Sequence, residues 1–211
     1  MTVTVIAPHP DDESIGCGGV LCKHSARGDR VVVVYLTSGE LGLKSLPKKT
    51  AWKTREREAQ RAAKVLGVAA TVFLRAPDWA VAEDAKNLSE QLGALFRQER
   101  PQMIYLPHPA EWHPDHKACW PILSGVLASG LLPDVTVRAY EVWTPLTEFD
   151  HVEDITAEMQ RKMRAVRCHR SQLHEFAYDR AVRGLNQFRG IMSGRCRYAE
   201  VFQSLAEKGS S

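Results

Sequence analysis

The chain has 211 residues, of which 44% are hydrophobic and 25% charged, and its formal net charge is only +3. This length and balance predict one folded domain over residues 1–211, and the small charge, without a long basic block or a zinc-finger spacing, makes nucleic acid a poor partner. No apolar run approaches 18 residues and no basic-then-apolar leader precedes the first strand, so we expect a cytoplasmic protein without a membrane anchor.

Apolar, β-branched runs alternate with helical patterns along the first two thirds of the chain. Strands are predicted at residues 2–7, 30–36, 70–76, 102–107 and 135–143, with helices between them at 15–27, 52–66, 84–99 and 116–129. The run "VVVV" in the second strand has no polar alternation, which is typical of a strand covered on both faces. The pattern predicts an α/β fold with a Rossmann-like, doubly wound, mostly parallel sheet and helices on both faces.

After about residue 155 the pattern becomes helical. The segments "TAEMQRKMRAVRCHRSQL" and "YAEVFQSLAEK" both resemble helices, separated by a polar stretch. We therefore expect a C-terminal helical extension over about residues 155–207 that belongs to the same domain.

Polar loops follow the first four predicted strands. "PHPDDE" follows the first strand, "TSGELG" the second, "PDW" the third and "HPAEWHPDH" the fourth. Ligands of doubly wound sheets bind beyond the carboxyl ends of the strands. We therefore expect these four loops to share one rim of the sheet.

The run "GCGG" after the first strand suggests a dinucleotide-binding loop, but the spacing argues against it. Leu21 occupies the position where the last glycine of that motif is required, and the acids before the run would repel a pyrophosphate. The glycines are better explained by a close approach of the first helix to the sheet.

Two imidazoles and a carboxylate form the strongest chemical pattern. His9 and Asp12 lie three residues apart at a strand–helix junction, and His116 follows about a hundred residues later on the same predicted rim. Such a set leaves a fourth coordination position open, as in catalytic zinc sites. Histidine and carboxylate ligands also suit iron(II) or another divalent ion. If the acids are only helix caps and the prolines only shape loops, no metal is needed.

Further polar residues adjoin this candidate site. Asp11 could take a proton from water, and His113 could donate one or stabilise an oxyanion. Glu13 and Asp115 could orient the metal ligands, although loop capping explains them equally well. A dication would offset the crowding of Asp11, Asp12 and Glu13.

At these residues the sequence resembles the LmbE / PIG-L family of zinc-dependent N-acetylglucosamine de-N-acetylases, in its bacterial small-molecule branch. The signature motifs stand here as "PHPDDE" at residues 8–13 and "HPDH" at residues 113–116, and lesser matches such as "HRSQ" and "YAEVF" extend the resemblance over nearly the whole chain. The resemblance implies the following roles: zinc ligation by His9, Asp12 and His116, general base catalysis by Asp11, oxyanion stabilisation by a His113 imidazolium, and substrate contacts by Arg55 and Asp78.

The expected function is zinc-dependent removal of acetyl from an N-acetylglucosamine-type amino-sugar conjugate. A metal-dependent amidase or esterase for another acyl substrate, or a non-catalytic sugar- or metal-binding protein, remain alternatives. The aglycone and the oligomeric state stay open, a homo-oligomer included. Four lysines make the loop 37–53 basic, so it is either a solvated loop or a lid that attracts an acidic aglycone: Lys44, Lys48, Lys49 and Lys53.

Overall fold

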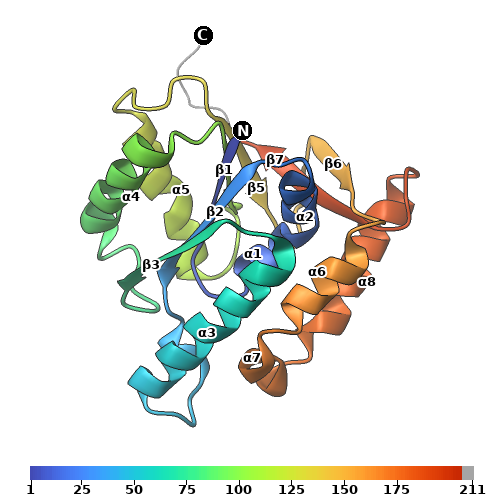
Figure 1. The fold of residues 1–211 in the computed structure, drawn as a ribbon, viewed down its shortest axis with the longest axis horizontal. Coiled ribbons are helices and arrows are strands. Elements are labelled where there is room, and N and C mark those ends of the chain that lie inside the picture. Colours follow the sequence, from blue (N-terminus) through green and yellow to red (C-terminus); the bar gives the residue numbers. More distant parts are fainter. Residues whose placement is uncertain (206–211) are drawn as a thin grey trace.

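The alternating strands and helices predicted for the first two thirds of the chain are present in the computed structural model, which describes residues 1–205 (Figure 1). The strands are β1 (Thr2–Ala7), β2 (Arg30–Thr37), β3 (Ala70–Ala76), β4 (Met103–Pro107) and β5 (Thr136–Tyr140). The helices between them are α1 (Asp12–Gly16), α2 (Gly18–Ala26), α3 (Lys48–Leu66), α4 (Ala85–Glu99) and α5 (Pro114–Leu127), with a short 3-10 helix η1 (Glu40–Gly42) after β2.

The sheet has seven strands in the order β3-β2-β1-β4-β5-β7-β6, and β1 to β5 pair in parallel. This arrangement confirms the predicted doubly wound α/β fold. The strand order reverses between β1 and β4, which pair directly, with Val5 opposite Tyr105. Chains leaving two such strands turn toward opposite faces of the sheet, and the crevice between them is the usual ligand site of this fold.

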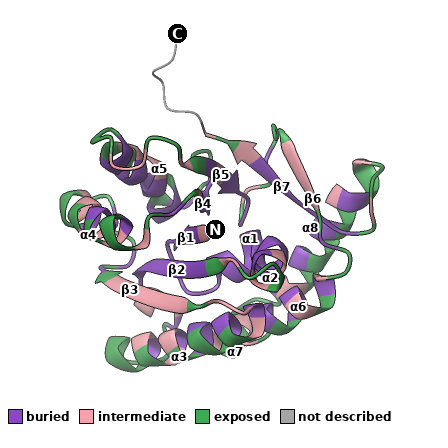
Figure 2. Cartoon of the chain, turned by 45° about the horizontal axis from the view of Figure 1, so that its top comes forward, coloured by how far each residue is buried: buried purple, intermediate pink, exposed green. Residues whose placement is uncertain are grey.

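Each face of the sheet carries its own hydrophobic core. Val31 and Val33 of β2 point into the core that includes α2 and α3, whereas Val32 and Val34 point into the core formed with α4 and α5. All four valines are fully buried, as the missing polar alternation predicted. Figure 2 shows the same layering, with the buried central strands between two helical layers and the edge strands β3 and β6 only partly buried.

The single helix expected at residues 15–27 is instead two helices, interrupted at Cys17. A side chain at Gly16 would collide with the ring of Tyr140 in β5, and one at Gly19 would collide with Ile155. The glycines therefore permit the close approach that their sequence pattern predicted, and the chain bends between them to make it.

The C-terminal part is only partly the helical extension that was expected. It contains α6 (Met159–Val166), α7 (Arg170–Glu175) and α8 (Tyr178–Met192), but also β6 (His151–Asp154) and β7 (Ala199–Ser204). Strand β7 lies antiparallel between β5 and β6. The prediction of a helix in "YAEVFQSLAEK" was therefore wrong over residues 199–204, and residues 206–208 lie outside the described part.

The buried carboxylate of Glu200 explains why strand β7 was not predicted from the sequence. Both faces of this strand are buried, so the sequence lacks a polar alternation, and Glu200 looks like a surface residue of a helix. Its carboxylate accepts hydrogen bonds from the backbone N–H groups of Gly19 and Val20 and pairs with Lys162 at 2.7 Å. Within residues 1–205, no helix is long and apolar enough to cross a membrane.

Candidate active site

The four polar loops meet at one rim, as predicted. A pocket of about 170 Å³ is lined by residues from each of the four loops, including His9, Gly42, Asp78 and His113. The loops after β1 and β4 come together because these two strands are neighbours at the reversal of the sheet.

Three donor atoms form a nearly equilateral triangle in this pocket. His9 Nδ1 lies 3.3 Å from Asp12 Oδ2, His116 Nε2 lies 3.3 Å from the same oxygen, and the two nitrogens are 3.3 Å apart. All three residues are buried. Tetrahedral zinc with bonds of about 2.0–2.2 Å separates its ligand atoms by roughly 3.3–3.5 Å, so the triangle has the size of one face of such a site.

Unpartnered polar atoms support the fit of a cation. Asp12 Oδ1 and His116 Nδ1 are buried and have no hydrogen-bond partner within the described residues. Buried polar atoms are normally paired, so an ion in the triangle would account for Asp12 Oδ1, whereas His116 Nδ1 lies on the far side of its ring. His116 Nδ1 also faces Glu111 Oε2 at 4.0 Å, on the side of the ring opposite the triangle.

Two other groups of buried side chains could hold an ion. The donor atoms of His9, His113 and His116 lie within 4.8 Å of one another, and so do those of His9, Asp78 and Asp115. In the second group, however, the carboxylates already have partners. Asp115 accepts backbone hydrogen bonds from Trp79 and Val81. The chemistry of the donors therefore favours the triangle over this second group.

The other ring nitrogen of His9 faces acids. His9 Nε2 lies 3.1 Å from Asp78 Oδ1 and 3.2 Å from Asp115 Oδ2, an arrangement that fixes the ring with Nδ1 toward the triangle. Burial alone would lower the pKa of His9, but hydrogen bonds with Asp115, Asp12 and Asp78 raise it well above its usual value. Burial would raise the pKa of Asp12, but His116 and His9 hold it far below its usual range.

Asp11 is buried beside the triangle in a strained backbone conformation. Its φ is 128°, a value that side-chain-bearing residues rarely adopt. Its backbone N–H donates to Glu13, and its carboxylate accepts hydrogen bonds from Arg55 Nη2 at 3.3 Å and from the hydroxyl of Tyr178 at 3.1 Å. Burial raises the pKa of Asp11 to about 6 even though the Arg55 charge lowers it. A carboxyl with this pKa is suited to proton transfer near neutral pH.

His113 is the N-cap of α5. Its Nδ1 accepts a hydrogen bond from the backbone N–H of Asp115 at 3.2 Å, which leaves Nε2–H as the donor of a neutral ring. Burial and the neighbouring His9 and His116 lower the pKa of His113 to about 4. At neutral pH this pKa favours a neutral imidazole with its Nε2–H available, and an imidazolium at this position stays a prediction.

The two residues expected to contact substrate are occupied by contacts within the protein. Arg55 is 4% exposed, and its guanidinium donates to the carbonyl oxygens of Gly39 and Pro10 as well as to Asp11. Asp78 accepts from His9 with one oxygen and from the backbone of Leu41 with the other. Both residues line the pocket, but these contacts hold other site residues in place, and substrate binding by either remains a prediction.

Sequence reasoning missed several residues of the site. Tyr178 reaches Asp11 from α8, Glu111 faces His116, and His169 lies 3.7 Å from Glu13 and is 1% exposed. "HRSQ" and the acid before "HPDH" were the only sequence signals for His169 and Glu111. Tyr178 has no motif of its own.

Aromatic side chains surround the mouth of the pocket. Trp79, Trp112 and Trp143 line it and are 53%, 57% and 39% exposed, so their faces are accessible. Lys48 and Lys49 line a different hollow together with Trp52, and none of the lysines in the described part of the chain lines the active-site pocket.

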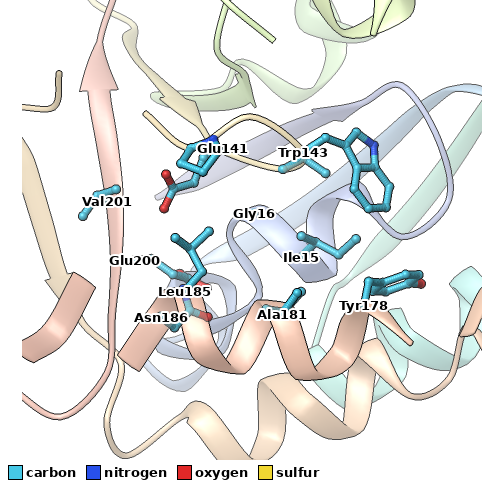
Figure 3. A pocket seen from close by; sticks show the side chains of 13 residues that line it. Ile15, Gly16, Glu141, Trp143, Tyr178, Ala181, Leu185, Asn186, Glu200 and Val201 are labelled. Atoms are coloured by element: carbon cyan, nitrogen blue, oxygen red, sulfur yellow. The ribbon is translucent and has the colours of Figure 1, made fainter. Parts of the chain in front are cut away.

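An apolar cavity of about 240 Å³ adjoins the site on the side of α8 (Figure 3). Trp143 lines both spaces, and the ring of Tyr178 lines the cavity while its hydroxyl contacts Asp11. These two rings pack edge to face with centroids 5.8 Å apart. Asp11 is thus separated from the apolar cavity by Tyr178.

The chain is similar to known proteins throughout. Residues 4–125 match the family described as "PIG-L: GlcNAc-PI de-N-acetylase". A diacetylchitobiose deacetylase of Thermococcus kodakarensis is 31% identical and covers 94% of this chain and 80% of its own length. The solved N,N'-diacetylchitobiose deacetylase of Pyrococcus horikoshii has a TM-score of 0.85 and 28% identity, over 97% of this chain and 83% of its own.

A solved protein with another activity shares the fold. GalB, the 4-carboxy-2-hydroxymuconate hydratase of Pseudomonas putida, has a TM-score of 0.83 over 100% of this chain and 98% of its own, with 23% identity. This likeness concerns the fold alone. Since one fold can support different reactions, the function has to be argued from the site.

Proposed function

This chain belongs to the PIG-L family of de-N-acetylases, and from that premise we propose that it is a zinc-dependent hydrolase that removes acetyl from an N-acetylglucosamine-type amino sugar. The observation that carries the proposal is the triangle of His9 Nδ1, Asp12 Oδ2 and His116 Nε2, with Asp11 and His113 beside it. A protein that only binds a sugar or a metal needs neither a buried carboxyl with a pKa of about 6 nor a fixed imidazole donor.

In this proposal His9, Asp12 and His116 hold the metal, with the fourth position open. Zinc bound there would supply Lewis-acid chemistry, which activates water and polarises the acetyl carbonyl. Asp78 and Asp115 orient His9 by accepting hydrogen bonds from Nε2. Glu111 faces the outer nitrogen of His116.

Asp11 moves the proton. As a carboxylate it takes a proton from the attacking water while the water oxygen bonds to the acetyl carbon. It then returns this proton to the sugar nitrogen as the C–N bond breaks, which releases acetate and the free amine. Arg55 and Tyr178 hold the two carboxylate oxygens in place, so that the base does not need to reorganise during the reaction.

His113 stabilises the charge that develops on the carbonyl oxygen. Its Nε2–H is the free donor, because the backbone N–H of Asp115 holds Nδ1 as an acceptor. A neutral imidazole at a helix N-terminus can polarise a carbonyl without first gaining a proton. Trp79 packs against the His113 ring with centroids 4.4 Å apart and limits its rotation.

The pocket favours a neutral, ring-shaped aglycone over an acidic one. Among residues 1–205, Arg55 is the only Arg or Lys that lines it, and its guanidinium already donates to Gly39, Pro10 and Asp11. The exposed faces of Trp79 and Trp112 are suited to stacking on a sugar ring. A second sugar therefore fits the mouth better than a carboxylic acid does.

Acetate release from a panel of conjugates tests the proposal. The zinc-loaded enzyme should release acetate from N-acetylglucosamine linked to a second sugar faster than from N-acetylglucosamine linked to an acid. The Asp11→Ala variant should bind one zinc and release no acetate. Release from simple esters but from no N-acetyl sugar would favour the alternative of an esterase, and an Asp11→Ala variant with the wild-type rate would remove the assigned base.

A further inference from the structure

A hollow of about 430 Å³ lies between α6 and α8, and shares no residue with the active-site pocket. The two helices run side by side on the same flank of the molecule in Figure 1. Four arginines line the hollow: Arg164 from α6, Arg167 directly after α6, Arg183 from α8, and Arg197 from the segment before β7.

The floor of the hollow is built from buried side chains. Met159 and Met163 are each 3% exposed and Tyr198 is 5% exposed. Arg183 and Arg197 both lie over the Tyr198 ring, with guanidinium carbons 5.7 and 5.4 Å from its centroid. Arg183 Nη2 also donates to the Tyr198 hydroxyl at 3.1 Å. Two of the four cations are therefore held at defined positions by one fixed ring.

These charges are almost uncompensated within the described residues. No acidic residue lines the hollow. Arg167 pairs with Asp179 at 3.1 Å, while the described contacts give the side chains of Arg164 and Arg197 no carboxylate partner. General basicity does not explain the cluster, because the chain as a whole carries a net charge of only +3. Positive charges around one concave surface repel one another, and together they create a positive electrostatic potential that attracts anions.

We propose that this hollow binds a small organic phosphate that carries at least two negative charges. Guanidinium groups are planar forks that match phosphate oxygens in pairs, and four of them offer more donors than a single carboxylate accepts. The hollow is also much larger than a phosphate group. Its floor of methionine side chains and a tyrosine ring provides a surface for a flat or apolar body attached to the phosphate.

Calorimetric titration of the zinc-loaded enzyme with ADP tests this proposal. Pyrophosphate probes the contribution of the negative charges alone, and adenosine probes the contribution of the uncharged nucleoside alone. The Arg183→Gln/Arg197→Gln variant should bind ADP at least about tenfold more weakly than the wild type. The Arg164→Gln variant, whose side chain makes no hydrogen bond within residues 1–205, should also weaken binding and guards against misfolding of the double variant. The matched control is Arg57→Gln, an exposed arginine of α3 away from the hollow. All variants should keep the wild-type rate of acetate release.

Several results would overturn the proposal. The wild type could fail to bind ADP. Binding could persist in the Arg183→Gln/Arg197→Gln and Arg164→Gln variants, which would place ADP elsewhere, for example at the active-site metal. Equal weakening by Arg57→Gln would indicate general attraction between the protein and anions. If adenosine bound as tightly as ADP, the negative charges would not contribute to binding. If pyrophosphate bound as tightly as ADP, the floor around Tyr198 would not contribute to binding.

Discussion

The hydroxyl of Tyr178 lies 3.1 Å from Asp11 Oδ2, although 167 positions separate the two residues in the chain. Helix α8 therefore contributes to a site that is built mainly from the loops at the carboxyl ends of the parallel strands, with Arg55 from α3. Burial raises the pKa of Tyr178 far above its usual value, so its hydroxyl stays protonated and donates to Asp11 over the working pH range. The residue is outside the part of the chain that matches the family model, residues 4–125.

Replacing Tyr178 by Phe should lower kcat/KM by roughly tenfold, because one hydrogen bond to the ionised carboxylate is lost while the ring remains. The same loss should move the acidic limb of the pH profile of kcat/KM to higher pH, since the hydroxyl stabilises the carboxylate form of Asp11. Tyr198→Phe removes a hydroxyl far from the site and is the control. A profile for Tyr178→Phe that matches the wild type would show that this contact does not position the base.

The Asp11→Asn variant should stabilise the chelated protein at alkaline pH. The pKa of Asp11 is raised from an ordinary 3.8 to about 6, so its ionisation opposes folding. This cost is fully present above about pH 6 and vanishes below pH 3.8. In urea unfolding, the free energy of unfolding of the variant should therefore exceed that of the wild type by up to about 3 kcal/mol at pH 8 and equal it near pH 3.5. The turnover of the variant should fall by about 100-fold or more, because the base is lost.

The exposed Asp134→Asn variant is the control for this measurement, because it should show no such dependence on pH. A loss of stability in Asp11→Asn at pH 8 would contradict the account. It would mean that the Arg55 and Tyr178 contacts outweigh the burial of the carboxylate.

The ligand set can be tested by zinc binding without any assay of turnover. His116→Ala should abolish stoichiometric zinc binding, because it removes one corner of the triangle. Asp115→Asn should keep one zinc with an affinity roughly 10- to 100-fold lower, since this side chain acts by orienting His9. The opposite pattern, zinc kept in His116→Ala and lost in Asp115→Asn, would move the site to the cluster of His9, Asp78 and Asp115.

Trp112→Ala should raise KM by about 3- to 10-fold with little change in kcat, because the exposed ring is expected to stack on the substrate away from the reacting atoms. Phe176→Ala, which removes another exposed aromatic ring that does not line the pocket, is the matched control.

Lys48→Gln/Lys49→Gln should leave KM for an anionic conjugate unchanged, because these lysines line a separate hollow. A large increase of KM in the lysine variant would instead support an attracting lid.

Lys162→Met should destabilise the fold by about 3–5 kcal/mol in urea unfolding, since it leaves the carboxylate of Glu200 buried without its cation. The double variant Lys162→Met/Glu200→Gln should recover part of this loss, because the uncompensated charge is gone. The partly exposed pair of Lys23 and Glu153 is the comparison, where Lys23→Met should cost about 1 kcal/mol or less. An equal loss of unfolding free energy in Lys162→Met and Lys23→Met would show that burial of the ion pair does not increase its contribution to stability.

The triangle of His9, Asp12 and His116 could be predicted from the sequence because its geometry follows from the topology. His9 and Asp12 follow β1, and His116 follows β4. Parallel strands in a doubly wound sheet place the loops at their carboxyl ends on the same rim. Each motif lies within a few residues and each strand is strongly apolar. The two motifs could therefore be assigned to one site although about a hundred residues separate them in the sequence.

Other features depended on contacts that no local pattern reports. Tyr178 is one aromatic residue among several in the C-terminal third, and only its hydrogen bond from α8 to Asp11 distinguishes it. Strand β7 is rich in residues that also suit helices, and Glu200 looks exposed in the sequence although it is 1% exposed in the structure. The pKa of His113 is lowered by burial and by its neighbours His9 and His116, and its N-cap contact with Asp115 orients the ring; spacing in the sequence reports neither.

A zinc titration of the chelated enzyme, with acetate release from an N-acetylglucosamine disaccharide measured at each step, tests whether this protein is a zinc-dependent deacetylase. We expect negligible release before zinc is added, a linear rise to a maximum at one zinc per chain, and no rise in the His116→Ala variant. Full release from the chelated enzyme before any zinc is returned would contradict this expectation.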